Sequence, residues 1–133
     1  CVIDLDTVMP GASAYDFGDA VRSGASTAEE DEVNLEKVSF SLELFEKFTE
    51  GFLTGTAGLL TPEEIDVLPL GARTLTLELA ARFLMDYLDG DIYFKVTRPE
   101  HNLIRARTQI KLAQDMEEKF SRMQAVVNRY RRT

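Results

Sequence analysis

Residues 61–88 read TPEEIDVLPLGARTLTLELAARFLMDYL, and this stretch predicts a long helix near the centre of the fold. Thr61 is a suitable N-cap, and Pro62 suits the first helical position because a proline there loses no hydrogen bond. Pro69 is expected to bend the helix, since proline removes a hydrogen bond from a helix interior. Residues 75–84 are apolar on most sides, which indicates a helix at the centre of a bundle.

Two more amphipathic helices are predicted on either side of this segment. Apolar residues recur at spacings of three and four before Gly55 and again after Pro99, a period typical of one buried helix face. The first stripe consists of Val38, Leu42, Phe45, Phe48 and Phe52. The second runs close to the C-terminus and consists of Leu103, Ala106, Ile110, Ala113, Met116, Phe120, Met123 and Val127. The sequence therefore predicts a mainly α protein.

The first eight residues predict a different element. Apolar residues alternate with Asp4 and Asp6 over residues 2–8, which favours a short strand. The chain opens inside this apolar run at Cys1 and without an initiator methionine. We therefore expect residues 1–133 to be a single helical fragment with one strand remnant, cut from a longer protein.

The segment after the strand predicts a turn, a short helix and a loop. Residues 9–13 contain Pro and Gly, which mark a turn. A short helix is expected over residues 15–23, with Asp16 in its first turn. Residues 24–34 are polar and acidic, and we expect a mobile loop there (the acidic loop).

Composition excludes several classes of protein. The 133 residues contain one cysteine and one histidine, His101, so an internal disulfide, a cysteine-based zinc site and a histidine-rich metal site are all excluded. The formal net charge of −8 argues against nucleic-acid binding, which requires lysine and arginine to neutralise phosphates. No apolar run is long enough to span a bilayer, and no signal peptide is recognisable. These features together predict a cytoplasmic protein.

Asp4 and Asp6 are the candidate metal ligands. Residues two apart in a strand point to the same face, so the two carboxylates would lie together. Two carboxylates on an otherwise apolar strand are costly unless a cation neutralises them, and Mg²⁺ commonly uses one or two carboxylates together with substrate phosphates. The alternative is an edge strand whose two carboxylates face water.

The order of these motifs resembles a family of phosphotransferases. A Val-Ile-Asp strand, a loop and then Tyr15-Asp-Phe-Gly-Asp-Ala20 resembles the end of the active site in the aminoglycoside phosphotransferase and choline kinase-like family. The resemblance implies the helical C-terminal part of a protein-kinase-like fold. It also implies that Asp4 coordinates the Mg²⁺ that bridges the ATP phosphates, that Asp6 supports the metal or its loop, and that Asp16 braces the catalytic loop.

Longer stretches resemble the N-acetylhexosamine 1-kinase branch of this family. They are residues 2–11, residues 15–22 and the stretch RFLMDYLDGDIYF over residues 82–94. Such enzymes transfer the γ-phosphate of ATP to the anomeric hydroxyl of GlcNAc or GalNAc. The resemblance implies that Arg82 and Tyr93 contact the sugar.

The residues themselves leave a second interpretation of Arg82 open. An arginine inside an apolar helix is costly unless its donors meet a partner, and a sugar could be that partner. An ion pair with Glu78 or Asp86 on the same helix face is an equally good explanation.

Several parts of the family's active site are missing from this sequence. The resemblance places the catalytic aspartate upstream of Cys1, together with the phosphate loop and the nucleotide-binding lysine. Phosphoryl transfer depends mainly on positioning and charge stabilisation, so these losses should abolish turnover. We therefore expect no catalytic residue and no kinase activity in residues 1–133, and an ATP-dependent, Mg²⁺-dependent sugar kinase as the parent protein.

Two other functions remain open. The acceptor could be homoserine, choline or an aminoglycoside, and Asp89, Asp91 and the acidic loop could supply the negative charge that a polycation needs. The chain could instead be a non-catalytic helical interaction module, although that leaves the Asp4 and Asp6 pair unexplained. Exposed apolar surface around residues 2–3 and residues 75–84 would in addition favour pairing with a second copy.

Overall fold

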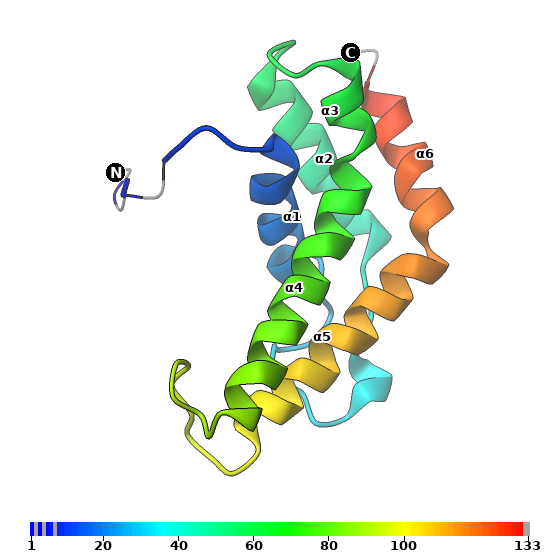
Figure 1. The fold of residues 1–133 in the computed structure, drawn as a ribbon. Coiled ribbons are helices and arrows are strands. Elements are labelled where there is room, and N and C mark those ends of the chain that lie inside the picture. Colours follow the sequence, from blue (N-terminus) through cyan, green and yellow to red (C-terminus); the bar gives the residue numbers. More distant parts are fainter. Residues whose placement is uncertain (2, 4, 7, 132–133) are drawn as a thin grey trace.

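The computed structural model describes residues 1, 3, 5, 6 and 8–131, which form six α-helices and one 3₁₀ turn (Figure 1). The helices are α1 (Ser13–Gly24), α2 (Leu42–Thr56), α3 (Pro62–Asp66), α4 (Leu68–Leu88), α5 (His101–Glu118) and α6 (Phe120–Tyr130), and the 3₁₀ turn is η1 (Leu35–Lys37). Helix α4 packs against both α1 and α5, and α2 packs against α6. The mainly helical class predicted from the sequence is confirmed, whereas its assignment to the protein-kinase-like fold stays a prediction.

The long helix expected over residues 61–88 is divided at Val67. Thr61 and Glu64 form a capping box at the start of α3, where Thr61 Oγ1 accepts the Glu64 N–H at 3.2 Å and Glu64 accepts the Thr61 N–H at 2.8 Å. Val67 then leaves the helical conformation, and Pro69 lies in the first turn of α4. A proline in a first turn removes no hydrogen bond, so the bend expected at Pro69 is wrong and the break precedes it.

The helix predicted near the C-terminus is also divided, at Lys119. Asp115 accepts hydrogen bonds from Lys119 Nζ at 2.6 Å and from the Phe40 N–H at 2.5 Å, and Lys119 Nζ donates to the Phe40 carbonyl at 2.8 Å. This cluster joins the segment before α2 to the junction of α5 and α6. The change of direction allows α6 to pack along α2.

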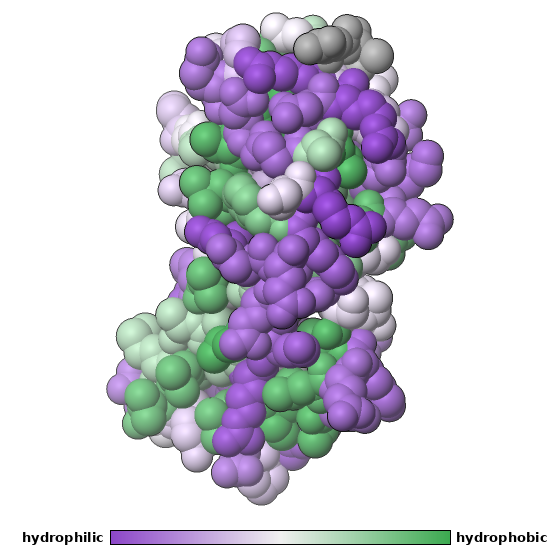
Figure 2. Space-filling model, turned by 90° about the vertical axis from the view of Figure 1, so that its right-hand side faces the viewer, coloured by the Kyte–Doolittle hydropathy of each residue, from purple (hydrophilic) through white to green (hydrophobic). Residues whose placement is uncertain are grey.

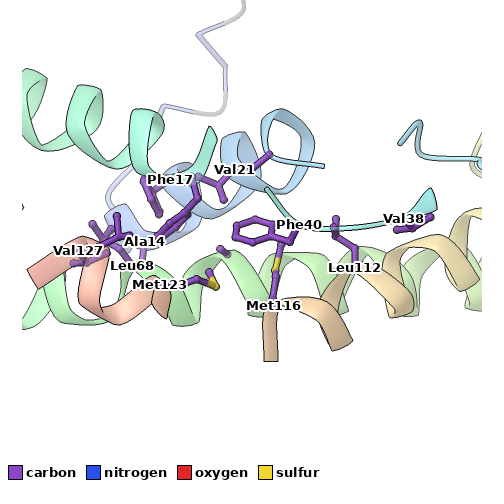
Figure 3. Packing of buried hydrophobic residues seen from close by; sticks show 14 residues of the cluster. Ala14, Phe17, Val21, Val38, Phe40, Leu68, Leu112, Met116, Met123 and Val127 are labelled. Carbon is purple, nitrogen blue, oxygen red and sulfur yellow. The ribbon is translucent and has the colours of Figure 1, made fainter. Parts of the chain in front are cut away.

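One apolar core runs between the helices, and glycines let two of them touch. A Cβ on Gly18 would lie 2.6 Å from the Gly71 carbonyl carbon, so the backbones of α1 and α4 approach closely only because both residues lack side chains. Most of the predicted stripes are buried, but Phe48 and Ile110 are partly exposed. Figure 3 shows the core from Val127, Leu68, Ala14 and Phe17 at one end, through Phe40 and Met116, to Val38 and Leu112 at the other.

The short N-terminal strand is not found among the described residues of the segment. Ile3, Leu5 and Val8 are exposed, and the segment extends away from the helices in Figure 1. A strand needs a neighbour for its backbone hydrogen bonds, and the described chain contains only one isolated bridge, between Ser26 and Phe40.

The acidic loop makes several contacts with the helices, contrary to the mobile loop that we expected. Arg22 on α1 lies 3.2 Å from Glu30, and Asp31 pairs with Arg98 at 3.0 Å and with His101 at 2.9 Å. Its carboxylates therefore fix the loop to two helices rather than repelling one another. Among the described helices, none is long and apolar enough to cross a membrane.

Candidate functional site

A pocket of about 330 Å³ lies where α4 ends and the connection to α5 folds back over it. We call this connection, residues 89–100, the pocket loop. The last turns of α4 and the pocket loop together supply the lining, which consists of Arg82, Met85, Asp86, Asp89, Ile92, Tyr93 and Phe94. The pocket therefore includes both residues predicted to contact a sugar.

Asp86 holds the pocket loop in place. Its side chain is only 5% exposed, and Oδ1 accepts the N–H groups of Ile92 at 3.0 Å and Tyr93 at 2.7 Å. The other oxygen accepts the Phe94 N–H at 3.0 Å and the Asn102 side-chain amide at 2.8 Å. One carboxylate thus binds three successive backbone donors, which fixes the position of the two aromatic residues.

These donors also stabilise the charge of Asp86. Burial by itself raises the pKa of this carboxyl, but the N–H groups of Tyr93, Phe94 and Ile92 and the amide of Asn102 outweigh it and lower the pKa below the ordinary value. Asp86 therefore remains an anion whose oxygens are occupied within the protein. It positions the pocket wall rather than offering a free carboxylate to a ligand.

Asn102, on α5, joins Asp86 to the rest of the pocket loop. Its amide donates to Asp86 and also to Asp91 at 2.8 Å, while its carbonyl accepts from Arg105 at 3.0 Å. The guanidinium of Arg105 lies 5.4 Å from the ring centre of Phe83 and donates to the Lys95 carbonyl. The start of the loop is therefore bound to α5 by a fully buried polar side chain.

The other end of the pocket loop is bound to the acidic loop through His101. The Thr97 N–H donates to His101 Nδ1 at 3.2 Å, so the ring proton lies on Nε2 and points to Asp31 at 2.9 Å. Arg98 donates to the same aspartate. Both ends of the pocket loop are therefore fixed by buried or half-buried polar groups.

Arg82 lies against the aromatic residues of the pocket. Its guanidinium carbon is 5.6 Å from the ring centre of Tyr93 and 5.5 Å from that of Phe94, within the range of cation–π attraction. Its Nε is 3.7 Å from Glu78. The expectation that Arg82 lies inside an apolar environment is wrong, because its side chain is on the outer face of α4 and is substantially exposed. Of the two ion pairs considered for Arg82, the one with Glu78 is present. Asp86 instead accepts hydrogen bonds from the pocket loop and Asn102.

Tyr93 is 75% exposed, and its ring meets Phe94 edge to face at 4.9 Å. Phe94 in turn packs against Phe83 at 4.6 Å, which anchors the aromatic pair on the core side of α4. The structure thus brings Arg82 and Tyr93 together in one pocket, and their role as sugar contacts stays a prediction.

The residues predicted for the metal end of the site are not brought together in the same way. Asp4 lies outside the described residues. Asp6 and Asp16 are both exposed, and no residue of the described chain forms a side-chain hydrogen bond or ion pair with either. Asp16 lines a shallow groove between α1 and α2 instead.

The two predicted groups of site residues are also far apart along the bundle. The first half of α1, which carries Asp16, packs at Gly18 against Gly71 in the first turn of α4. Arg82 lies 11 residues beyond Gly71, or about 16 Å along a helix that rises 1.5 Å per residue. Asp16 and Arg82 therefore belong to different regions of the surface.

The described residues do not form a Mg²⁺ site. In the part of the chain that the structure describes, no three His, Cys, Asp or Glu side chains gather as a metal-binding group. A lone exposed Asp6 does not provide the carboxylate pair from which a magnesium site was inferred. The described residues therefore do not fit the metal by themselves.

Asp86 and Asn102 were missed as site residues by the sequence analysis, although one signal was present. An aspartate in the last turn of a helix faces the negative end of the helix dipole, so it needs other donors nearby. The Asp-Gly-Asp turn that follows, with Gly90 at φ 93° and Asp91 at φ 60°, returns the chain so that its N–H groups meet that carboxylate. No comparable signal indicated His101.

A comparison with protein-family models finds no match to this chain. The geometry of the pocket and the motif resemblance are therefore the observations on which a functional proposal is based.

Proposed function

We propose that this chain is the acceptor-binding, helical part of an ATP-dependent small-molecule kinase whose acceptor is an N-acetylhexosamine such as GlcNAc or GalNAc. The observation that supports this best is the pocket in which Arg82, Tyr93 and Phe94 are held together by a buried carboxylate. In this proposal the remainder of the active site, including the catalytic aspartate, is supplied by the parent protein. Mg²⁺ and ATP belong to that parent activity, and no step is assigned to the metal on the described residues.

The chemistry of the pocket suits a neutral sugar ring. Aromatic faces such as Tyr93 and Phe94 pack against the apolar C–H face of a pyranose, while the Arg82 guanidinium can donate to a hydroxyl or an N-acetyl carbonyl. Asp89 lines the same pocket and can accept from sugar hydroxyls. Polar groups at the rim and apolar rings at the wall give both affinity and orientation.

The same pocket is less suited to an aminoglycoside, which is a polycation. Asp86 has its oxygens occupied by four donors, and Asp91 accepts from Asn102. Asp89 is then the remaining carboxylate among the lining residues, and Arg82 adds a positive charge to the same pocket. A polycation would meet too little free negative charge at this site.

Ligand titrations of the chain followed by amide NMR shifts test the acceptor assignment. GlcNAc and GalNAc are expected to shift the signals of residues 92–94, whereas kanamycin, choline and homoserine leave them unchanged. Arg82→Ala should weaken the binding by about tenfold, because a charged hydrogen-bond donor is lost. Arg107→Ala, an exposed arginine on α5, is the matched control and should bind normally. Shifts caused by kanamycin alone would reject the neutral-sugar assignment.

A separate assay tests the expected lack of turnover. The chain is incubated with ATP, Mg²⁺ and GlcNAc, and sugar phosphate is measured over hours. We expect no product above the background without protein, because the positioning groups for phosphoryl transfer are supplied elsewhere. Measurable turnover would show that the chain itself holds a complete catalytic site.

A further inference from the structure

A largely apolar stripe lies on the outer face of α4. Its residues are spaced alternately four and three apart, and all of them are exposed. Leu88 is 74% exposed and Leu77 is 46% exposed, values that are unusual for leucines on a helix packed between two others. The α4 stripe consists of Leu70, Thr74, Leu77, Ala81, Leu84 and Leu88.

The stripe is separate from the side of α4 that forms the core. Ala72, Thr76, Ala80 and Phe83 are buried on the opposite side, where α1 and α5 pack. In Figure 1, α4 lies at the front of the bundle with no helix drawn over its forward side, and this front forms the left-hand edge of Figure 2. Apolar side chains lie along that edge both above and below its middle. The core does not use these six residues.

The spacing of the stripe indicates a helix as its partner. Alternating steps of four and three give a 3.5-residue period, which keeps a seam in contact with a second helix through left-handed packing. Leucines at every seventh position, Leu70, Leu77 and Leu84, occupy one position of the heptad. The smaller Thr74 and Ala81 occupy most of the other, which lets the helices approach closely.

We infer that the α4 stripe is an interface with a second copy of this chain, in which the two α4 helices pack side by side and parallel. A stripe with this repeat is complementary to itself, as a two-fold interface requires. This inference is independent of the proposed kinase function, because it rests on the outer face of α4 alone.

The charges beside the stripe favour the parallel arrangement. Arg73 flanks one side of the stripe and Glu78 flanks the other, five residues further on. A parallel pair places each of these residues opposite the partner's oppositely charged one, as in pairing across a coiled-coil seam. An antiparallel pair centred on the stripe would bring the two Glu78 side chains together.

Glu78 is accessible for this contact, and Arg73 is partly accessible: its side chain is 30% exposed, and its guanidinium also lies over the Phe120 ring. Within one copy, Glu78 is half exposed and 3.7 Å from Arg82, a distance that makes a weak surface pair. Glu117 contacts a single terminal nitrogen of the Arg73 guanidinium, so the other terminal nitrogen can still donate.

Sedimentation velocity over a range of protein concentrations tests the association in a Cys1→Ser background. The mass is expected to rise from 15.0 kDa towards twice that value with concentration. Leu77→Glu should abolish the rise, because it places two negative charges in the seam. Leu59→Glu, at a leucine that is 84% exposed and outside the stripe, should leave it unchanged. Circular dichroism verifies that both variants keep their helices.

Disulfide cross-linking tests the orientation. In the parallel arrangement Thr74 of one copy faces Thr74 of the other, so Thr74→Cys should form a disulfide-linked dimer on mild oxidation. In the antiparallel arrangement a mixture of Thr74→Cys and Leu84→Cys chains would form the mixed dimer instead. A chain that stays monomeric, a Leu77→Glu variant that still dimerises, or the mixed dimer would each overturn the inference.

Discussion

The two ends of the proposed active site contain carboxylates with opposite surroundings. At the pocket end, Asp86 is buried and accepts three backbone N–H groups and one amide. Towards the N-terminus, Asp6 and Asp16 are exposed, and the described chain gives neither a partner. An aspartate side chain is thus held in place by the fold in one region, whereas in the other region the aspartates are solvated.

This difference separates a feature that is complete within the chain, the pocket, from one that would need further groups, the N-terminal carboxylates. The pocket wall is complete within the chain, because Asp86 belongs to α4 and all four of its donors come from the pocket loop or α5. The N-terminal carboxylates would acquire a function only when other groups or a cation approach them. In the proposed function, the acceptor pocket should therefore bind its ligand in the isolated chain, whereas the metal end should not bind its cation.

The largest effect is expected from Asp86→Ala, which removes the buried carboxylate at the pocket end. Three N–H groups and the Asn102 amide lose their acceptor at once, so the pocket loop should detach from α4. Hydrogen exchange of the Tyr93 amide is expected to accelerate by more than about a hundredfold, and sugar-induced NMR shifts should disappear. Exchange rates in α1 and α2 serve as the internal reference. An unchanged Tyr93 exchange rate would show that the aromatic packing alone holds the loop.

A somewhat smaller effect is expected from Asp115→Ala, which tests whether a partly buried carboxylate away from the pocket matters in the same way. Burial raises the pKa of Asp115, but Lys119, the Phe40 N–H and Ser39 outweigh burial and lower it below the ordinary value. The substitution leaves the Lys119 ammonium and the Phe40 N–H without this acceptor. The free energy of unfolding should fall by about 2 kcal/mol in urea titrations. Glu118→Ala, at an exposed neighbour, should change it by less than about 0.5 kcal/mol.

The lowered pKa values also predict how stability depends on pH. Asp86 and Asp115 both ionise more readily in the folded chain than their ordinary pKa of 3.8 allows. Their contribution is therefore fully present above about pH 5, well above the ordinary pKa, and is lost as the pH falls through the lower, folded-state pKa values. Urea midpoints should be nearly constant from pH 7 to about pH 5 and fall steeply below about pH 4. In Asp115→Asn the fall should be shallower, and an equally steep fall would assign it to other carboxylates.

Most of the helices could be predicted from sequence periodicity, whereas their ends depended on tertiary contacts. The N-cap at Thr61 is a local signal and was predicted, and the structure adds its reciprocal partner Glu64. The break at Lys119 depends on Asp115 meeting Phe40, which is 75 residues away in sequence, and no local pattern contains that contact. Similarly, the N-terminal alternation favours a strand, but a strand forms only beside another one.

The residues of the candidate site also divide into those that the sequence predicted and those that depend on tertiary contacts. Arg82 and Tyr93 were identified through the motif resemblance, and the structure places them in one pocket. Asp86 was considered only as an ion-pair partner for Arg82, because three of its four donors are backbone N–H groups, which carry no residue identity, and the fourth, Asn102, is 16 residues away in the sequence. A carboxylate that accepts hydrogen bonds mainly from backbone N–H groups cannot be recognised by looking for pairs of side chains in the sequence.

The smallest effect is expected from Asp16→Asn, which probes the other side of the comparison. Asp16 lies in the first turn of α1, where its charge interacts favourably with the helix dipole and with no side chain of the described chain. Losing that charge should lower the free energy of unfolding by about 0.5 kcal/mol and leave the sugar-induced shifts of residues 92–94 unaltered. Asp19→Asn on the same helix is not a suitable control, because Asp19 pairs with Arg22 at 3.1 Å. Glu63→Gln in the first turn of α3 is the matched control. If the free energy of unfolding fell by more than about 2 kcal/mol in Asp16→Asn and did not do so in Glu63→Gln, Asp16 would already brace part of this chain. The carboxylates at the two ends would then be more alike than their exposure indicates.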